Sequence, residues 1–226
     1  GQRVDERTPC ARLGFTMDAA FWNQRFSATD FYYGTEPNEF VAAIAAQLPP
    51  GPVLCLGEGE GRNAVFLASR GHDVTAVDQS AVGLAKAEHL AARRGLTLCT
   101  QTADLADFAI AEGVWSGIVA TFVHLPPALR RTVHRRAAAG LKPGGCLALE
   151  LYHPDQVRYR TGGPVNTPEL LATLAALREE LAGTGVEYLI AREQVREVRE
   201  GPGHTGLGSV VQLLARRPVI SSPPSP

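Results

Sequence analysis

Lysine is scarce in this sequence, and neither sign of charge is in excess. Lys86 and Lys142 are the only lysines, arginine supplies the other basic side chains, and the formal net charge is -1. A nucleic-acid-binding domain would show a basic excess or a basic stripe, so the composition argues against that class of protein. We therefore expect no nucleic-acid partner.

Paired cysteines and long apolar runs are missing as well. The four cysteines, Cys10, Cys55, Cys99 and Cys146, form no C-x-x-C pair, which disfavours a zinc site. The last three lie in apolar, strand-like runs, so we expect buried free thiols in a reducing compartment and no bound metal. No apolar run is long enough to span a membrane, and the sequence does not open on a signal-peptide pattern. These absences predict a cytoplasmic protein with no membrane partner.

Hydrophobic residues are plentiful: they make up 45% of the 226 residues, enough for the core of one α/β domain. Apolar, strand-like runs alternate along the chain with segments of helical spacing. Strands are predicted at residues 52–56, 73–77, 96–101, 115–123 and 142–152, and helices at residues 61–70, 81–94, 127–140 and 167–183. This alternation is typical of a doubly wound α/β fold, in which helices cover both faces of a parallel sheet.

The two ends of the chain depart from this pattern. The last two predicted strands, 187–198 and 208–217, are joined by a loop without a helix, so they should pair antiparallel. Ahead of the first strand, Asp18 should cap a short helix and Asn38 a second one. We expect an N-terminal segment (1–37) that begins with a loose arm (1–16), a main domain (38–217) and a disordered tail (218–226).

A glycine-rich loop follows the first predicted strand. Gly57, Gly59 and Gly61 join that strand to the first helix, and ligands of doubly wound sheets bind at the carboxyl ends of the strands. Asp78 ends the second strand about twenty residues further on, where an acid accepts both ribose hydroxyls. Asp104 follows the third strand and is placed to receive an adenine amino group. Contacts at the ends of three successive strands predict an adenosine site.

Two glutamates in the same loop narrow the choice of adenosine compound. Glu58 and Glu60 would repel the pyrophosphate of a dinucleotide, which prefers bare amides at a helix N-terminus. S-adenosylmethionine carries a sulfonium and an ammonium group and no phosphate, so carboxylates are favourable beside it. Arg62 could then pair with the carboxylate of that ligand. The loop therefore suits a cationic cofactor, and all three side chains are candidate contacts.

Several stretches of the chain resemble class I S-adenosylmethionine-dependent methyltransferases, over about residues 20–217. They are "VLCLGEGEGRNAVFLASRGHDVTAVDQS", "TADL", "IVATFVHLP" and "GLKPGGCLALELY". "GEGRNA" and "YGTEPNEF" are similar to small bacterial enzymes of the tellurite-resistance and thiopurine type. The resemblance implies seven strands in the order 3-2-1-4-5-7-6, with strand 7 antiparallel.

The same resemblance implies further features of the site. Gln79 and Leu105 join the expected contacts to S-adenosylmethionine. The segment before the first strand folds over the cofactor as a lid in similar enzymes, which brings Tyr32 and Tyr33 into the site. One position departs from the family, because Cys55 stands where these enzymes usually have an acid.

Candidate catalytic residues lie where the transferable methyl group is expected. His124 follows the fourth strand and could orient the acceptor or remove its proton. Tyr33 in the lid and His204 in the loop between the last two strands could reach the same place. Tyr152 and His153 end the fifth strand and are further candidates for the acceptor pocket.

The sequence thus predicts an S-adenosylmethionine-dependent methyltransferase of a small molecule. Methyl transfer is an in-line displacement that mainly requires alignment of the reacting atoms. Its acceptor could be a thiol or a chalcogen compound, which needs no strong base, or the oxygen or nitrogen of a small natural product. A non-catalytic module that binds the cofactor is a further alternative, and the protein should be a monomer or a homodimer. A nicotinamide-dependent oxidoreductase is disfavoured, because it would need a G-x-G-x-x-G loop and a second catalytic domain.

Overall fold

The structure is a computed structural model that describes residues 17–219. The arm expected at residues 1–16, with Cys10, and the tail from residue 220 lie outside the described residues. Within the described range, one sheet has the strand order β3-β2-β1-β4-β5-β7-β6. Its strands are β1 (Pro52–Leu56), β2 (Asp73–Asp78), β3 (Cys99–Thr102), β4 (Trp115–Thr121), β5 (Leu141–Tyr152), β6 (Glu187–Glu200) and β7 (His204–Arg216). β7 is antiparallel to both of its neighbours, so the expected sheet order and its reversed strand are confirmed.

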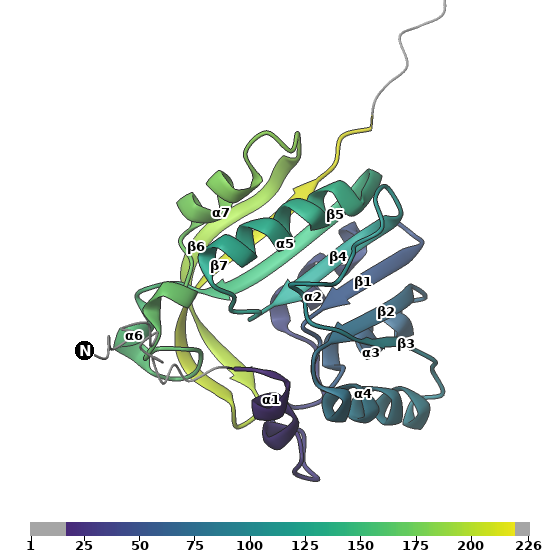
Figure 1. The fold of residues 1–226 in the computed structure, drawn as a ribbon, viewed down its shortest axis with the longest axis vertical. Coiled ribbons are helices and arrows are strands. Elements are labelled where there is room, and N and C mark those ends of the chain that lie inside the picture. The colour runs from purple at the N-terminus through teal and green to yellow at the C-terminus, as the bar shows by residue number, and fades with distance from the viewer. Residues whose placement is uncertain (1–16, 220–226) are drawn as a thin grey trace, which may run out of the picture.

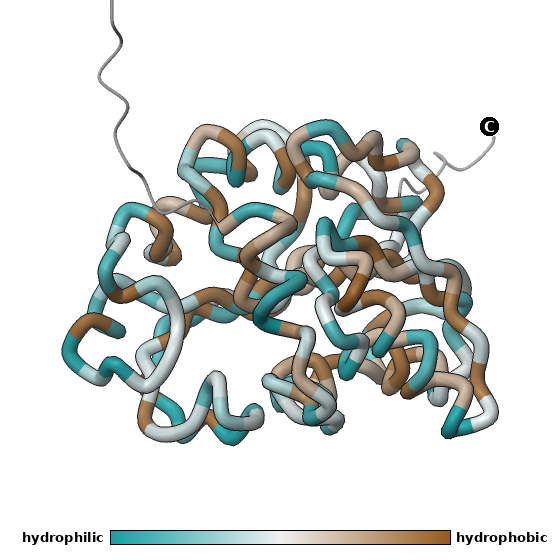
Figure 2. The backbone as a smooth tube through the Cα atoms, turned by 60° about the horizontal axis from the view of Figure 1, so that its bottom comes forward, coloured by the Kyte–Doolittle hydropathy of each residue, from teal (hydrophilic) through white to brown (hydrophobic). Residues whose placement is uncertain are grey.

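Helices cover both faces of this sheet (Figure 1). They are α1 (Ala19–Arg25), α2 (Glu39–Ile44), α3 (Arg62–Ser69), α4 (Ala81–Arg93), α5 (Pro127–Gly140), α6 (Gln156–Tyr159) and α7 (Leu174–Leu181). On one face, α5 and α7 bury Val133 and Leu177 against the strands, and on the other α2, α3 and α4 bury Phe40, Leu67 and Leu84. Along the helices the chain alternates between hydrophilic and hydrophobic residues, as helices with one apolar face do (Figure 2). No helix within residues 17–219 has the length and apolarity needed to cross a bilayer.

The strand order reverses in the middle of the sheet. β1 pairs with β2 on one side and with β4 on the other, so the chain winds outward in both directions from this point. The loops at the carboxyl ends of β1 and β4 consequently diverge and leave a crevice between them. This crevice is where a doubly wound sheet binds its ligand.

The helix predicted over residues 167–183 forms only in its second part, and its predicted first part is wrong. A single 3-10 turn, Pro168–Leu170, is followed by extended chain, and α7 begins only after Thr173, whose hydroxyl accepts from the Ala176 N–H at 3.1 Å. The Ala172 N–H donates to the Tyr152 carbonyl at 3.1 Å. This contact with β5 holds the chain extended just where a continuous helix would have run.

The predicted loop at 199–207 is also wrong, because both strands continue into it. β6 runs to Glu200 and β7 starts at His204, which leaves only a short turn at residues 201–203. The third strand is displaced too, from the predicted 96–101 to β3. Cys99 on this strand is exposed, contrary to the buried thiol that we expected, since β3 is an edge strand with a neighbour on one side only.

Gly61 lets the start of α3 lie directly against α4. Its φ is +90°, and a Cβ there would stand 2.4 Å from the Ala87 Cβ and 2.7 Å from the Ala87 Cα. Gly71 has nearly the same backbone, with φ +87°, but a Cβ there would meet nothing within 4 Å. The two positions share a left-handed backbone and differ in the space around them.

Substitution of these two glycines by alanine should therefore separate backbone strain from packing. Gly71→Ala should lower the free energy of unfolding by about 1–2 kcal/mol, the cost of a left-handed alanine. Gly61→Ala should lower it by about 1–3 kcal/mol more, because α4 must also move. Urea unfolding of both variants measures the difference, and equal losses would contradict the close packing of α3 on α4.

Candidate functional site

A cavity of about 490 Å³ lies over the carboxyl ends of the central strands. Its volume is in the range of about 300–1,000 Å³ that is usual for small-molecule sites. The glycine loop, β2 and the start of α3 form one end of this cavity, and residues 121–125 after β4 with residues 162–167 form the other. The N-terminal segment, including α1 and Tyr33, contributes side chains to the wall. Most of the side chains predicted for the site, scattered over the sequence, line this one cavity.

The Asp78 carboxylate joins the glycine loop to the end of β2. It accepts hydrogen bonds from the Gly59 N–H at 2.8 Å and the Ser80 N–H at 2.7 Å, and it lines the cavity. Burial raises the pKa of Asp78, and the N–H groups of Ser80 and Gly59 oppose that shift. Each carboxylate oxygen has a second lone pair, so Asp78 keeps the capacity to accept from a ligand hydroxyl.

Three more of the predicted contacts lie beside Asp78 on the cavity wall. The Gln79 side chain donates to the Met17 carbonyl at 3.0 Å, which ties the N-terminal segment to the end of β2. Asp104 is exposed, and its carboxylate accepts from the Ala106 N–H at 2.8 Å. Leu105 is buried and presents an apolar surface. Together they give this part of the cavity wall one apolar and two polar side chains.

Glu58 caps the helix that follows the loop. Its carboxylate accepts from the Ala64 N–H at 2.7 Å in the first turn of α3, where a negative charge is favoured. Burial is the main cause that raises the pKa of Glu58 to about 7. Cys55 is fully buried close to Glu58, and both burial and that carboxyl group raise the pKa of its thiol. A carboxyl group therefore stands at the helix start although Cys55 replaces the usual acid.

Glu60 turns away from the cavity and holds the N-terminal segment. Its carboxylate accepts from the Tyr32 N–H at 2.8 Å and the Tyr33 N–H at 3.4 Å, and Lys86 pairs with it at 2.5 Å. The Lys86 ammonium also donates to the carbonyls of Ala28 and Asp30. Glu60 is absent from the cavity lining, so its contacts here differ from the cofactor contact predicted for it.

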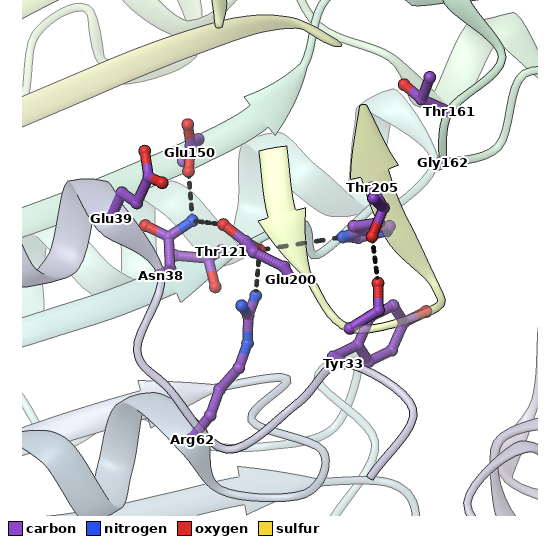
Figure 3. A network of polar contacts seen from close by, with 12 residues as sticks. Tyr33, Asn38, Glu39, Arg62, Thr121, Glu150, Thr161, Gly162, Glu200 and Thr205 are labelled. Atoms are coloured by element: carbon purple, nitrogen blue, oxygen red, sulfur yellow. Dashed lines mark hydrogen bonds and ion pairs between the residues drawn. The ribbon is translucent and has the colours of Figure 1, made fainter. Parts of the chain in front are cut away.

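Arg62 lies at the cavity wall within a buried network of charges. Its guanidinium pairs with Glu200 at 2.6 Å, and the second terminal nitrogen, Nη1, is buried without a hydrogen-bond partner among the described residues. Asn38 donates to both Glu150 and Glu200, as Figure 3 shows, and Arg196 pairs with the same two carboxylates. Sequence reasoning missed this network, because "REQVREVRE" has the alternating charges of a solvated strand.

The other end of the cavity is lined by rings. The Tyr33 and Phe122 rings lie 4.6 Å and 4.7 Å from the His204 ring, and His124 lies beyond Phe122. Phe122 has a left-handed φ of 55°, which is unusual for a large residue and occurs preferentially at functional sites. Tyr152 packs behind these rings outside the cavity lining. The sequence did not single out Phe122.

Burial keeps these titratable rings neutral. It lowers the pKa of His124 to about 4 and that of His204 well below its usual value, and it raises the pKa of Tyr33 to about 12. Both ring nitrogens of His124 and the Nδ1 of His204 are buried without a hydrogen-bond partner in the described part of the chain. The ring-lined end thus offers apolar faces and a few unused polar atoms, which are free to contact a ligand.

His153 does not join this group. Its ring faces Asp155 and Glu193, both at 3.6 Å, outside the cavity lining. Within residues 17–219, no three histidine, cysteine, aspartate or glutamate side chains lie together as a metal site requires. The fold and this cavity at its switch point are typical of doubly wound α/β proteins, which bind their ligands at the carboxyl ends of the strands.

Comparisons with known proteins agree with that class. Residues 53–145 match a family model described as a methyltransferase domain. The chain is 31% identical over 125 residues to the 2-heptyl-1-hydroxyquinolin-4(1H)-one methyltransferase of Mycobacteroides abscessus. The matched region covers 53% of this chain and 55% of the relative. The chain spans about half the length of that relative.

Solved structures show the same fold at lower identity. A protein of echinomycin biosynthesis, described by the conversion of a disulfide bond into a thioacetal group, has a TM-score of 0.71 and 21% identity and covers 91% of each chain. TehB from Haemophilus influenzae has a TM-score of 0.62 and 19% identity, over 88% of this chain and 66% of its own. Residues 53–145 thus match a methyltransferase domain, and the chain has the same fold as these solved structures.

Replacement of Lys86 should loosen the N-terminal segment. In Lys86→Met, Glu60 stays buried without its cation and the carbonyls of Phe26, Ala28 and Asp30 lose a charged donor, each bond contributing about 1.5–3 kcal/mol. Backbone amides at residues 28–33 should then exchange hydrogen about 10–100-fold faster. Lys142→Met is the matched control, since within residues 17–219 Lys142 donates only to the Pro50 carbonyl. Equal exchange in the two variants would contradict the anchoring role of Lys86.

Proposed function

We propose that this protein transfers a methyl group from S-adenosylmethionine to a small-molecule acceptor that binds at the ring-lined end of the cavity. The observation that carries this proposal is the division of one cavity into a polar end at the glycine loop and a neutral, aromatic end beside it. Such a cavity accommodates a cofactor and an acceptor next to each other. The relative from Mycobacteroides abscessus, a methyltransferase of a small molecule, supports the same function.

The residues at the glycine loop fit the cofactor. In this proposal the Gly57–Gly61 backbone faces the methionine part, Arg62 receives the carboxylate on its unpartnered Nη1, and Asp78 accepts the ribose hydroxyls. Asp104, Gln79 and Leu105 hold the adenine. Glu58 supplies a carboxyl group close to the positive end of the ligand, and its raised pKa means that a nearby cation would favour the ionised form. Glu60 acts from outside, by holding Tyr32 and Tyr33 in the wall.

The chemistry of the proposed reaction asks little of the protein beyond alignment. The bound cofactor supplies a methyl group on a positively charged sulfur, a leaving group that needs no further activation. Tyr33, His124 and His204 exclude water from the ring-lined end and orient the acceptor. Neutral imidazoles leave the charge of the sulfonium uncontested, since a histidinium beside it would repel it. The N-terminal segment, which contributes Tyr33 and α1 to the wall, is the proposed lid.

The rings favour a flat acceptor with a hydroxyl or thiol group. Phe122, His204 and Tyr33 offer faces and edges against which an aromatic ring packs well. The hydroxyquinolinone in the name of the Mycobacteroides abscessus relative is such a compound. A small thiolate or chalcogenide is the second candidate, because His124, with a pKa of about 4, is a weak base and an ionised nucleophile needs none.

Binding of the cofactor should depend on Asp78. Calorimetry should show saturable binding of S-adenosylmethionine and S-adenosylhomocysteine but not of NAD, and Asp78→Asn should weaken that binding about 10–100-fold, because the hydroxyls lose an ionised acceptor. Asp73→Asn, at the opposite and exposed end of β2, is the matched control and should bind as the wild type does. A folded wild type that binds neither adenosyl ligand would exclude the proposed function.

Turnover identifies the acceptor. Release of S-adenosylhomocysteine should be measured with hydroxyquinolines, phenols, thiophenols and a selenide. Activity with the aromatic compounds supports the flat acceptor, and activity with selenide alone supports the chalcogen candidate. Cofactor binding without turnover on any of them would favour the non-catalytic module that the sequence left open.

A further inference from the structure

The Glu200 carboxylate lies next to two side chains of the cavity wall, Arg62 and His204. Its Oε1 accepts from Asn38 at 2.9 Å and from Arg196 at 3.0 Å. Its Oε2 lies 2.6 Å from the Arg62 Nη2 and 4.0 Å from the His204 Nδ1. One oxygen is therefore firmly held, while the other faces the Arg62 guanidinium and the His204 imidazole. Figure 3 shows Glu200 with Asn38 and Arg62 on either side.

Both neighbours of this oxygen have a nitrogen without a partner. Arg62 Nη1 and His204 Nδ1 are buried and have no hydrogen bond among residues 17–219. The 4.0 Å between Glu200 and His204 exceeds the usual hydrogen-bond length by about 1 Å. A small rotation of the Glu200 carboxylate toward His204 would close that gap and would satisfy Nδ1, at the expense of the contact with Arg62.

A ligand carboxylate on Arg62 would favour that rotation. In the structure, Glu200 is the carboxylate that pairs with the Arg62 guanidinium. A second carboxylate, brought by the cofactor, would share the guanidinium and weaken the hold of Arg62 on Glu200. The freed oxygen would then be buried next to an N–H donor, and a buried carboxylate oxygen is far more stable with such a donor than without it.

We propose that Glu200 is a positioning residue that acts through His204. When the carboxylate of the bound cofactor occupies Arg62, Glu200 accepts a hydrogen bond from the Nδ1–H of His204. The other ring nitrogen, Nε2, then faces the substrate as the proton acceptor for its hydroxyl or thiol group. This inference rests on the proposed function. The proton passes from the acceptor to Nε2, while the proton on Nδ1 stays on the ring and is shared with Glu200. Cofactor binding thereby prepares the base before the acceptor reacts.

Other charged and titratable groups face the pair and set its resting state. They come from five parts of the chain: Arg25 and Tyr33 of the N-terminal segment, Arg62 of α3, His124 after β4, Glu150 and Tyr152 of β5, and Arg196 of β6. Burial first and then the nearby cations keep the pKa of His204 low without a ligand. A carboxylate that moves onto Nδ1 would raise it, since it stabilises the imidazolium.

The test is an NMR measurement of the His204 tautomer and pKa, with and without S-adenosylhomocysteine. His204→Gln assigns the signal among the six histidines. In the wild type, the ligand should shift His204 to the Nδ1–H tautomer and raise its proton affinity about tenfold or more, one pKa unit. In Glu200→Gln these changes should be absent, while the ligand should bind at least as tightly, because the competing carboxylate is gone.

Glu197→Gln is the matched control and should behave as the wild type does. Glu197 is an exposed glutamate of β6, and among the described residues its carboxylate pairs only with Arg199. A wild type that binds S-adenosylhomocysteine with no change at His204, or a change that persists in Glu200→Gln, overturns the inference and leaves the proposed function intact. A wild type that does not bind the ligand overturns both. Should Glu200→Gln fail to fold, Glu200→Asp takes its place in the comparison with the wild-type spectra. Its shorter side chain should not reach His204, so the ligand should no longer shift the tautomer of His204.

Discussion

Two buried carboxylates, Glu150 and Glu200, govern how the site is assembled. A carboxylate removed from water must be paired and hydrogen-bonded, or its burial costs more than the fold can offset. Their partners are Asn38 before α2, Arg62 at the start of α3, Arg196 of β6 and Gln212 of β7. The cost of leaving either carboxylate unpaired therefore fixes the spatial relation of the start of α2, the start of α3 and the last hairpin. Arg62 also lines the cavity, so this network supports part of the cavity wall.

The sequence predicted the parts of this protein that depend on local pattern. Apolar strands, the glycine loop and acids at strand ends, such as Asp78, follow from short-range rules, and the sheet order followed from the family resemblance. The missed features depend on distant contacts. The sequence around Glu200 does not predict its burial against Arg62. The sequence around Ala172 likewise does not predict the contact with β5 that interrupts the helix there. The ring cluster likewise joins Tyr33, Phe122 and His204 from three remote segments.

The two ends of the cavity differ in charge as well as in the side chains that line them. At the glycine loop, Asp78, Glu58 and Arg62 offer charges and charge-bearing groups, each held by backbone N–H groups or by an opposite charge. At the ring-lined end, burial removes charge from histidine and tyrosine alike. The cationic cofactor and the flat ring compound that we propose as ligands would each suit one of these two environments. In that proposal, each end of the cavity disfavours the ligand of the other. Orientation in such a site follows from solvation as much as from individual hydrogen bonds.

Lys86 occupies a position that requires lysine, although lysine is nearly absent from this chain. Its ammonium nitrogen meets four oxygens, from Phe26, Ala28, Asp30 and Glu60, arranged around a single atom. A tetrahedral ammonium serves acceptors that converge in three dimensions, whereas a guanidinium spreads its donors over a plane. Arginine, which carries the positive charge almost everywhere else in the sequence, has the wrong symmetry for this position. The identity of residue 86 is therefore dictated by coordination geometry, even in a composition that otherwise avoids lysine.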